Sequence, residues 1–216
     1  MNAARAIAIL ETAGLPLVTT SEAAALWGVS VKAGSEMLRR LAAAGVVHHL
    51  RRGLWARGEI DPLRAVERLA EPDTAYVSLL TALRLHGMVD QLAPAVQAVT
   101  TGRARSVETP IGAFELHHLS PAFCRGFDRA AGFPLATPEK ALVDVLYLSA
   151  TRDRTLSRLP ELELPRAFSE ARARWWVRQI PDWRSRAGVA ARLRSVLAET
   201  GSTGRRTARR APRPAR

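Results

Sequence analysis

The sequence has little cysteine: Cys124 is the only one among 216 residues. A single cysteine excludes an internal disulfide and any cysteine-rich zinc site. No apolar run approaches the roughly 18 residues that a helix needs to cross a bilayer. The short apolar stretch at residues 7–10 lies between Arg5 and Glu11 and lacks the long apolar centre of a signal peptide. We therefore expect a cytoplasmic protein, folded as one large or two small domains.

Recognisable catalytic motifs are also missing. The sequence contains no phosphate-binding loop, nucleophile elbow or metal-ligand spacing. Glu139 is explained by a helix start, and Lys140 and Asp144 by a pair four residues apart on one helix. We therefore expect no enzyme, no cofactor and no metal site. The alternative is a metal-dependent nuclease, which would require Glu115, His117 and Asp144 to lie close together.

Positive charge is present in excess and lies at the two ends of the chain. The net charge is +12, divided as +4 over residues 1–57, −3 over 58–151, +5 over 152–200 and +6 over 201–216. Basic ends attract polyanions, of which nucleic acid is the commonest in a cytoplasmic protein. Thirty of the 32 basic residues are arginine, which suits recognition of phosphate and guanine. The codon bias of a GC-rich genome explains the arginine excess equally well.

Residues 1–57 have the outline of a helix-turn-helix. Hydrophobic spacing and capping signals predict helices over 3–13, 23–27 and 31–44. Thr19 and Glu22 form a capping-box pattern before the second helix, and Ser30 can cap the third. Gly28 ends the second helix. A short turn between two such helices is typical of DNA-binding helix-turn-helix units.

The third predicted helix divides into two faces. Gly34, Leu38 and Leu41 recur at core spacing. The opposite face carries Lys32, Ser35, Glu36 and Arg39, which are residue types that reach base edges and phosphates in the major groove. Glu36 has two interpretations, an acceptor for a cytosine amino group or, as we favour, a partner of Arg40 along the helix.

A basic hairpin is predicted directly after this helix. Residues 46–50 and 54–57 have strand composition, and Arg51-Arg52-Gly53 forms the turn between them. A hairpin with a cationic tip after a recognition helix is typical of a winged helix, whose wing contacts the DNA backbone or minor groove. The residues expected to bind DNA are Lys32, Ser35, Glu36, Arg39, Arg40, Arg51 and Arg52.

Residues 58–150 are predicted to form a compact α/β domain. Helices are expected over 63–70, 75–86 and 138–149, and strands over 94–101, 105–108, 113–119 and 133–135. In residues 151–200, two segments, 166–178 and 185–199, have helical composition. The tryptophans Trp175, Trp176 and Trp183 lie among arginines and either stack on nucleic acid or, as we favour, dock on the α/β domain. Residues 201–216 have the composition of a disordered basic tail.

Several ordered segments of residues 1–150 resemble the AbiEi family of antitoxin-type transcriptional regulators from bacterial abortive-infection modules. They are Tyr76-Val77-Ser78-Leu79-Leu80, Leu85-His86-Gly87-Met88, the run from Thr109 to Leu119 and the run from Thr137 to Asp144. The resemblance implies an α+β protein, with an N-terminal winged helix-turn-helix followed by an α/β antitoxin-type domain and C-terminal helices.

The function that the resemblance implies is that of an autorepressor and antitoxin. The expected partners are double-stranded DNA with inverted repeats in the protein's own promoter, bound by one or two copies, and a nucleotidyltransferase-like toxin. Whether the toxin is bound directly is left open, so a module that binds the toxin is a second alternative. The family supplies no well-defined catalytic residues.

Overall fold

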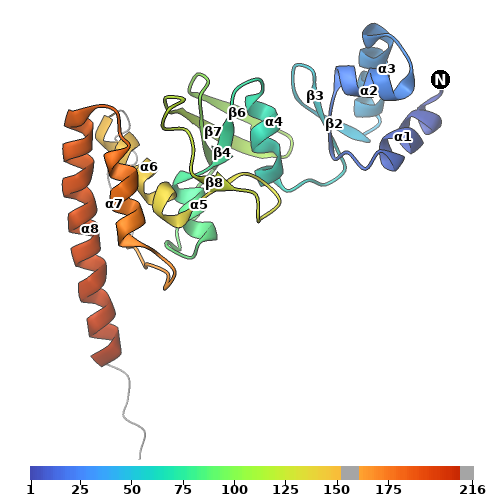
Figure 1. The fold of residues 1–216 in the computed structure, drawn as a ribbon. Helices are drawn as coiled ribbons and strands as arrows, with labels where there is room; N and C mark the ends of the chain where they lie inside the picture. Colours follow the sequence, from blue (N-terminus) through green and yellow to red (C-terminus); the bar gives the residue numbers. More distant parts are fainter. Residues whose placement is uncertain (152–160, 210–216) are drawn as a thin grey trace, which may run out of the picture.

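The computed structural model describes residues 1–151 and 161–209, and its fold is mixed α+β. A unit of three helices and a small sheet lies at one end, a six-stranded sheet lies in the middle, and a pair of helices lies at the other end (Figure 1). Within the described residues, no helix is both long and apolar enough to cross a membrane.

The N-terminal unit contains the elements expected from its capping signals and one strand more. Its elements are α1 (Ala3–Thr12), β1 (Leu17–Thr19), α2 (Thr20–Trp27), α3 (Val31–Ala43), β2 (Val47–Arg51) and β3 (Leu54–Arg57). The three strands pair antiparallel in the order β1-β3-β2. Leu10, Trp27, Leu38 and Trp55 belong to a core of the unit's own, and the indole N–H of Trp27 donates to the Ala6 carbonyl at 3.1 Å.

The middle of the molecule is a mixed sheet. Its elements are the 3-10 helix η1 (Pro62–Ala65), α4 (Val66–Ala70), β4 (Ala75–Val77), α5 (Leu79–Leu85), β5 (Val96–Thr100), β6 (Arg105–Thr109), β7 (Gly112–His118), β8 (Phe127–Asp128) and β9 (Leu135–Ala136). The strand order is β6-β7-β5-β4-β9-β8, with β5–β7 and β4–β9 parallel. The strand predicted over 94–101 and the hairpin predicted over 105–119 are confirmed.

The helix predicted over residues 75–86 is wrong in its first turn. Residues 75–77 form β4, a fully buried strand inside the sheet, and the helix α5 begins only at Leu79. The apolar residues Tyr76, Leu79 and Leu83 have helical spacing, but a buried strand followed by a helix produces the same spacing over so short a segment. Aromatic and β-branched residues such as Tyr76 and Val77 pack well in a sheet, and here tertiary pairing overrides the helical pattern.

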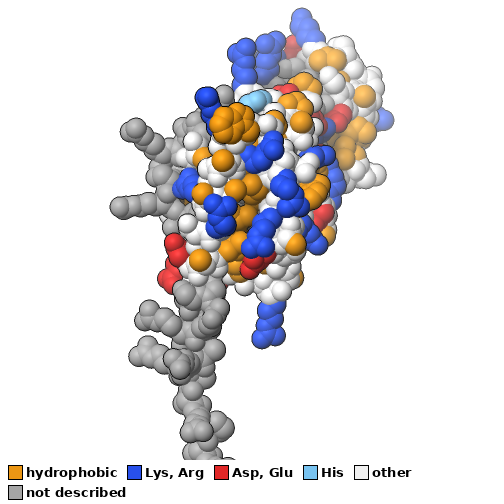
Figure 2. Space-filling model, turned by 60° about the vertical axis from the view of Figure 1, so that its left-hand side comes forward, with side chains coloured by type: hydrophobic (Ala, Val, Ile, Leu, Met, Phe, Trp, Pro, Cys, Tyr) orange, Lys and Arg blue, Asp and Glu red, His pale blue; other side chains and the backbone are white. Residues whose placement is uncertain are grey.

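Three C-terminal helices pack on one another beside the sheet. They are α6 (Pro138–Thr151), α7 (Glu170–Arg178) and α8 (Trp183–Arg209). The expected docking of tryptophans holds for Trp176, which is buried against Phe123 and so close to Gly126 that a Cβ there would lie 2.3 Å from the indole. It fails for Trp175 and Trp183, whose relative exposures are 41% and 68%. The side of the molecule on which α7 and α8 lie presents hydrophobic and basic side chains intermixed (Figure 2).

The sequence predicts a disordered tail from residue 201, and the structure differs from this prediction over residues 201–209. The backbone of α8 continues as helix to Arg209, and residues 210–216 of the expected tail lie outside the described residues. Extending an existing helix adds a hydrogen bond for each residue without a new nucleation step, so a weak local preference suffices. Residues 152–160 of the predicted helical extension also lie outside the described residues.

The larger hydrophobic core joins the two sheets. It contains residues from the six-stranded sheet and from α5 to α8, and it also contains Leu17, Leu50 and Leu54 of the N-terminal unit. The hairpin β2–β3 therefore contributes to both cores at once. Since burying a leucine side chain stabilises by roughly 1.5–3 kcal/mol, this contact fixes the N-terminal unit against the middle of the molecule.

Candidate nucleic-acid interface

The helix α3 is built by strong local signals and packs closely on α2. The Ser30 side chain accepts the backbone N–H of Ala33 at 3.3 Å and so caps the helix. Gly28 ends α2 in a left-handed conformation with φ of 64°, which glycine adopts readily. A Cβ on Gly34 would lie 2.9 Å from the Ala24 Cβ, so a glycine is required where the two helices meet.

The two faces of α3 separate as the sequence predicts. Gly34, Leu38 and Leu41 are buried. Four of the predicted contact residues, Lys32, Glu36, Arg39 and Arg40, are exposed, and Ser35 is half-buried. The helix thus directs a row of polar side chains into solvent while its other face is fully engaged.

The polar side chains of this face interact little with one another. Arg39 Nη2 donates to the Ser35 hydroxyl at 3.2 Å. The expected pair of Glu36 with Arg40 does not form: the ion pairs recorded among the described residues do not include it. An exposed pair of this kind gains little energy and orders two long side chains, so solvation of both is the ordinary outcome. The face therefore consists of cations and one acid that are free to meet a ligand.

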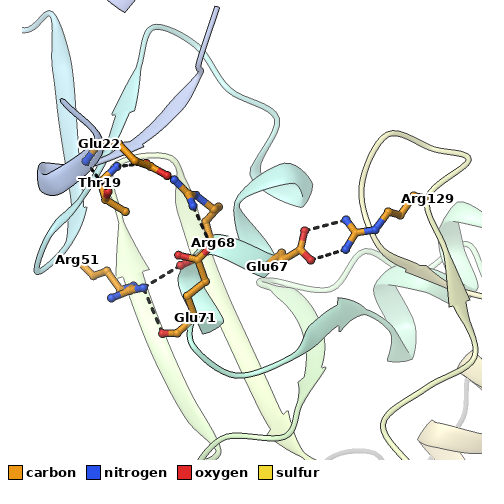
Figure 3. Close-up of polar contacts among 7 residues, drawn as sticks. All are labelled: Thr19, Glu22, Arg51, Glu67, Arg68, Glu71 and Arg129. Carbon is orange, nitrogen blue, oxygen red and sulfur yellow. Dashed lines mark hydrogen bonds and ion pairs between the residues drawn. The ribbon is translucent and has the colours of Figure 1, made fainter. Parts of the chain in front are cut away.

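The hairpin places its two arginines differently. Arg52 is exposed at the turn beside Gly53, whose φ is 79°. Arg51, which the sequence predicts as a DNA contact, is turned toward α4: its Nη2 donates to the carbonyls of Arg68 at 2.9 Å and Glu71 at 3.3 Å (Figure 3). Backbone carbonyls near a helix end attract a cation. Arg51 therefore attaches the hairpin to α4 and the residue that follows it.

A second polar contact joins the same two parts of the molecule. Arg68 on α4 lies between Glu22 of α2 and Glu71, and it pairs with both carboxylates (Figure 3). Glu22 is also the capping-box residue of α2, since its carboxylate accepts the Thr19 backbone N–H at 2.7 Å. The hydrogen bond from Arg68 lowers the pKa of Glu22 from 4.5 to about 2. We call Glu22, Arg51, Arg68 and Glu71 the hinge cluster.

The sequence predicts the capping role of Glu22 but not the hinge cluster. Glu22 and Arg68 are 46 residues apart, and nothing in the spacing of either segment points to the other. The only signal is the number of charged residues in the short segment 67–71. Beside the hinge cluster, Glu67 of α4 forms a two-pronged pair with Arg129, which fixes α4 to the loop after β8 (Figure 3).

The residues weighed as catalytic candidates form two separate groups. Glu115 and His117 share a face of β7, with 3.8 Å between Glu115 Oε2 and His117 Nε2. Asp144 is instead fully buried, where it accepts hydrogen bonds from the hydroxyls of Ser78 at 2.8 Å and Tyr76 at 3.1 Å and pairs with Lys140. Within residues 1–151 and 161–209, no three acids, histidines or cysteines are grouped so as to hold a metal ion.

The cluster around Asp144 is a structural core feature. Lys140 has no exposed surface and lies 4.0 Å from the ring centroid of Phe123 and 5.3 Å from that of Trp176. Burial lowers the pKa of Lys140 and raises that of Asp144, because both charged forms are separated from water.

The arrangement that remains available to a large ligand is the exposed face of α3, with Arg52 beyond it. Its charged residues are exposed, Ser35 is half-buried, and all of them except Arg52 lie on a well-packed helix. Such a surface can donate hydrogen bonds and positive charge to a polyanion. Neither the models of known protein families nor the curated proteins contain a match to this chain.

Proposed function

We propose that this chain is a transcriptional regulator that binds double-stranded DNA through its N-terminal unit, a winged helix-turn-helix with α3 as the recognition helix. The observation that carries the proposal is the exposed polar face of α3, since Lys32, Glu36, Arg39 and Arg40 point into solvent from a helix whose other face is buried. A helix of 13 residues with such a face has the dimensions and donors that the major groove accepts.

Each side chain has a role in this proposal. Lys32, Ser35 and Arg39 reach base edges or nearby phosphates, and Glu36 accepts from a cytosine amino group. Arg40 and Arg52 contact phosphates and fix the register. Arg51 holds the hairpin to α4 through the carbonyls of Arg68 and Glu71, so its removal would act through the position of the hairpin.

The biological role that we propose is autorepression combined with antitoxin activity. The resemblance of ordered segments to the AbiEi family supports it, and so does the positive charge of residues 1–57. In this role the N-terminal unit binds repeats in the protein's own promoter, and the middle domain counters a nucleotidyltransferase-like toxin. Co-purification with the product of a neighbouring gene tests whether the toxin is bound directly.

The proposal is tested by fluorescence anisotropy with the DNA upstream of the gene and with an unrelated duplex of equal length. Replacing Lys32, Ser35 or Arg39 by Ala should reduce discrimination between the two duplexes by roughly 1–3 kcal/mol where a base is contacted. Replacing Arg52 should weaken both alike and reduce the salt slope by about 0.9. Arg84→Ala removes one exposed charge on α5 and is the matched control. A triple variant of α3 that binds both duplexes like the wild type would refute the proposal.

A further inference from the structure

The helices α7 and α8, which carry two exposed tryptophans, lie at the opposite end of the molecule from α3 (Figure 1). Trp175 is in the last turns of α7 and Trp183 is the first residue of α8, so both flank the connection between the two helices. Their exposures of 41% and 68% are unusual for the largest apolar side chain. The neighbouring Trp176, by contrast, is buried in the core.

Basic side chains accompany these two indoles. The guanidinium of Arg184 lies 5.5 Å from the ring centroid of Trp183. Arg178 and Arg194 are exposed, and no ion pair recorded within the described residues involves either of them. Arg174 pairs with Glu170 on its own helix. The face that includes α7 and the start of α8 shows basic and hydrophobic side chains side by side (Figure 2).

Alternation of aromatic and cationic groups fits a single strand of nucleic acid better than a duplex or a protein. An exposed indole offers a flat face on which an unpaired base stacks, whereas the bases of a duplex already stack on each other. Arginines beside the rings neutralise the phosphates of the same strand. We propose that Trp175 and Trp183, with Arg178 and Arg184, form a binding site for single-stranded nucleic acid, which we call the Trp–Arg site.

The Trp–Arg site is independent of the DNA-binding function proposed for α3, because the two surfaces share no residue and lie at opposite ends of the molecule. A protein that fails to bind duplex through α3 can still bind a strand here, and the converse also holds. The two proposals therefore fail separately in the same assay.

The experiment uses the full chain and two fluorescein-labelled probes, a 12-nucleotide oligothymidylate and a 12-base-pair duplex of mixed sequence. Binding is followed by anisotropy and by quenching of tryptophan fluorescence. The Trp175→Ala/Trp183→Ala variant should bind the strand more weakly by roughly 5- to 150-fold for each stacked base that is lost. The Trp175→Phe/Trp183→Phe variant should retain most of the affinity, because phenylalanine also stacks. Arg178→Gln and Arg184→Gln should each reduce the salt slope for the strand by about 0.7.

Two controls keep the result specific. The Lys32→Ala/Arg39→Ala variant should bind the strand like the wild type, and the alanine variant of the two tryptophans should bind the duplex like the wild type. Trp183 is 68% exposed, whereas Trp175 also packs edge-on against Trp176 with 4.7 Å between the ring centroids. Circular dichroism of the tryptophan variants should therefore match the wild type, and any loss of thermal stability should come from the substitution of Trp175. An alanine variant with unchanged affinity for the strand overturns the Trp–Arg site. So does a wild-type chain that binds no strand and instead self-associates through these indoles in sedimentation.

Discussion

The charged side chains of α3 are exposed to solvent, whereas those of Lys140 and Asp144 on α6 are buried. On α3 the charged residues Lys32, Glu36 and Arg40 face solvent, and none of them forms an ion pair with another residue that the structure describes. On α6, Lys140 and Asp144 have no exposed surface, and Asp144 also accepts hydrogen bonds from two hydroxyls. Charges that a fold leaves exposed and unpaired are available to a ligand, whereas charges that it buries and saturates determine how the core packs.

The largest expected effect concerns the buried pair. Asp144→Ala leaves the Lys140 ammonium between aromatic rings without a counter-charge and should lower the free energy of unfolding by about 3–5 kcal/mol. The hydroxyls of Tyr76 and Ser78 lose their acceptor as well. Urea unfolding followed by circular dichroism measures the change.

A double variant separates the pair's packing role from any chemical role. Lys140→Met/Asp144→Leu removes both charges and should recover part of the lost stability, because apolar residues commonly replace a buried ion pair at little cost. The recovery should be incomplete, because the hydroxyls of Tyr76 and Ser78 still lack the Asp144 acceptor. The affinity of the double variant for duplex DNA should equal that of the wild type. A double variant that folds stably but no longer binds DNA would show that the buried pair on α6 contributes to DNA binding and does not act only in core packing.

The second effect concerns the buried side of α3. Gly34→Ala places a methyl group 2.9 Å from the Ala24 Cβ and should destabilise the N-terminal unit by about 1–3 kcal/mol, less the gain in helix propensity. Gly188→Ala in α8 is the matched control, because a Cβ there meets nothing within 4 Å. The control should raise stability by roughly 0.5–1 kcal/mol. Equal effects of the two substitutions, measured by thermal unfolding, would mean that α2 and α3 do not approach as closely as described.

The sequence predicts what local signals determine and misses what distant partners determine. The capping box of Thr19 and Glu22 and the two faces of α3 follow from spacings of three or four residues, and the structure contains both. Asp144 and its partner Tyr76 are 68 residues apart, and a strand that is buried on both faces has no alternation to reveal it. The spacing of Lys140 and Asp144 therefore predicts their pairing on one helix but not the burial of the pair.

The same distinction between local signals and distant partners applies to the candidate site. The exposure of α3 follows from its hydrophobic spacing, because the face opposite the core must meet solvent. The orientation of the Arg51 side chain cannot be predicted from the local sequence, because its acceptors are the carbonyls of Arg68 and Glu71, which are distant along the chain. A turn with two adjacent arginines gives no sign that one of them is used inside the protein.

The smallest effect concerns the hinge cluster. Its charges are paired and only partly buried, so it is intermediate between the exposed charges of α3 and the buried pair on α6. Glu22→Gln keeps a residue that suits the capping box but removes the charge that meets Arg68. The pKa of Glu22 is depressed in the folded state, from 4.5 to about 2. The charge therefore stabilises the fold above pH 4.5, and this contribution is lost as the pH falls from 4.5 toward about 2.

Above pH 5 the wild type should be more stable than the variant by about 1 kcal/mol or less, because the side chains are partly solvated. The two proteins should converge near pH 2 in urea unfolding curves, and a difference that stays constant from pH 6 to pH 2 would show that Glu22 acts through its shape and not through its charge.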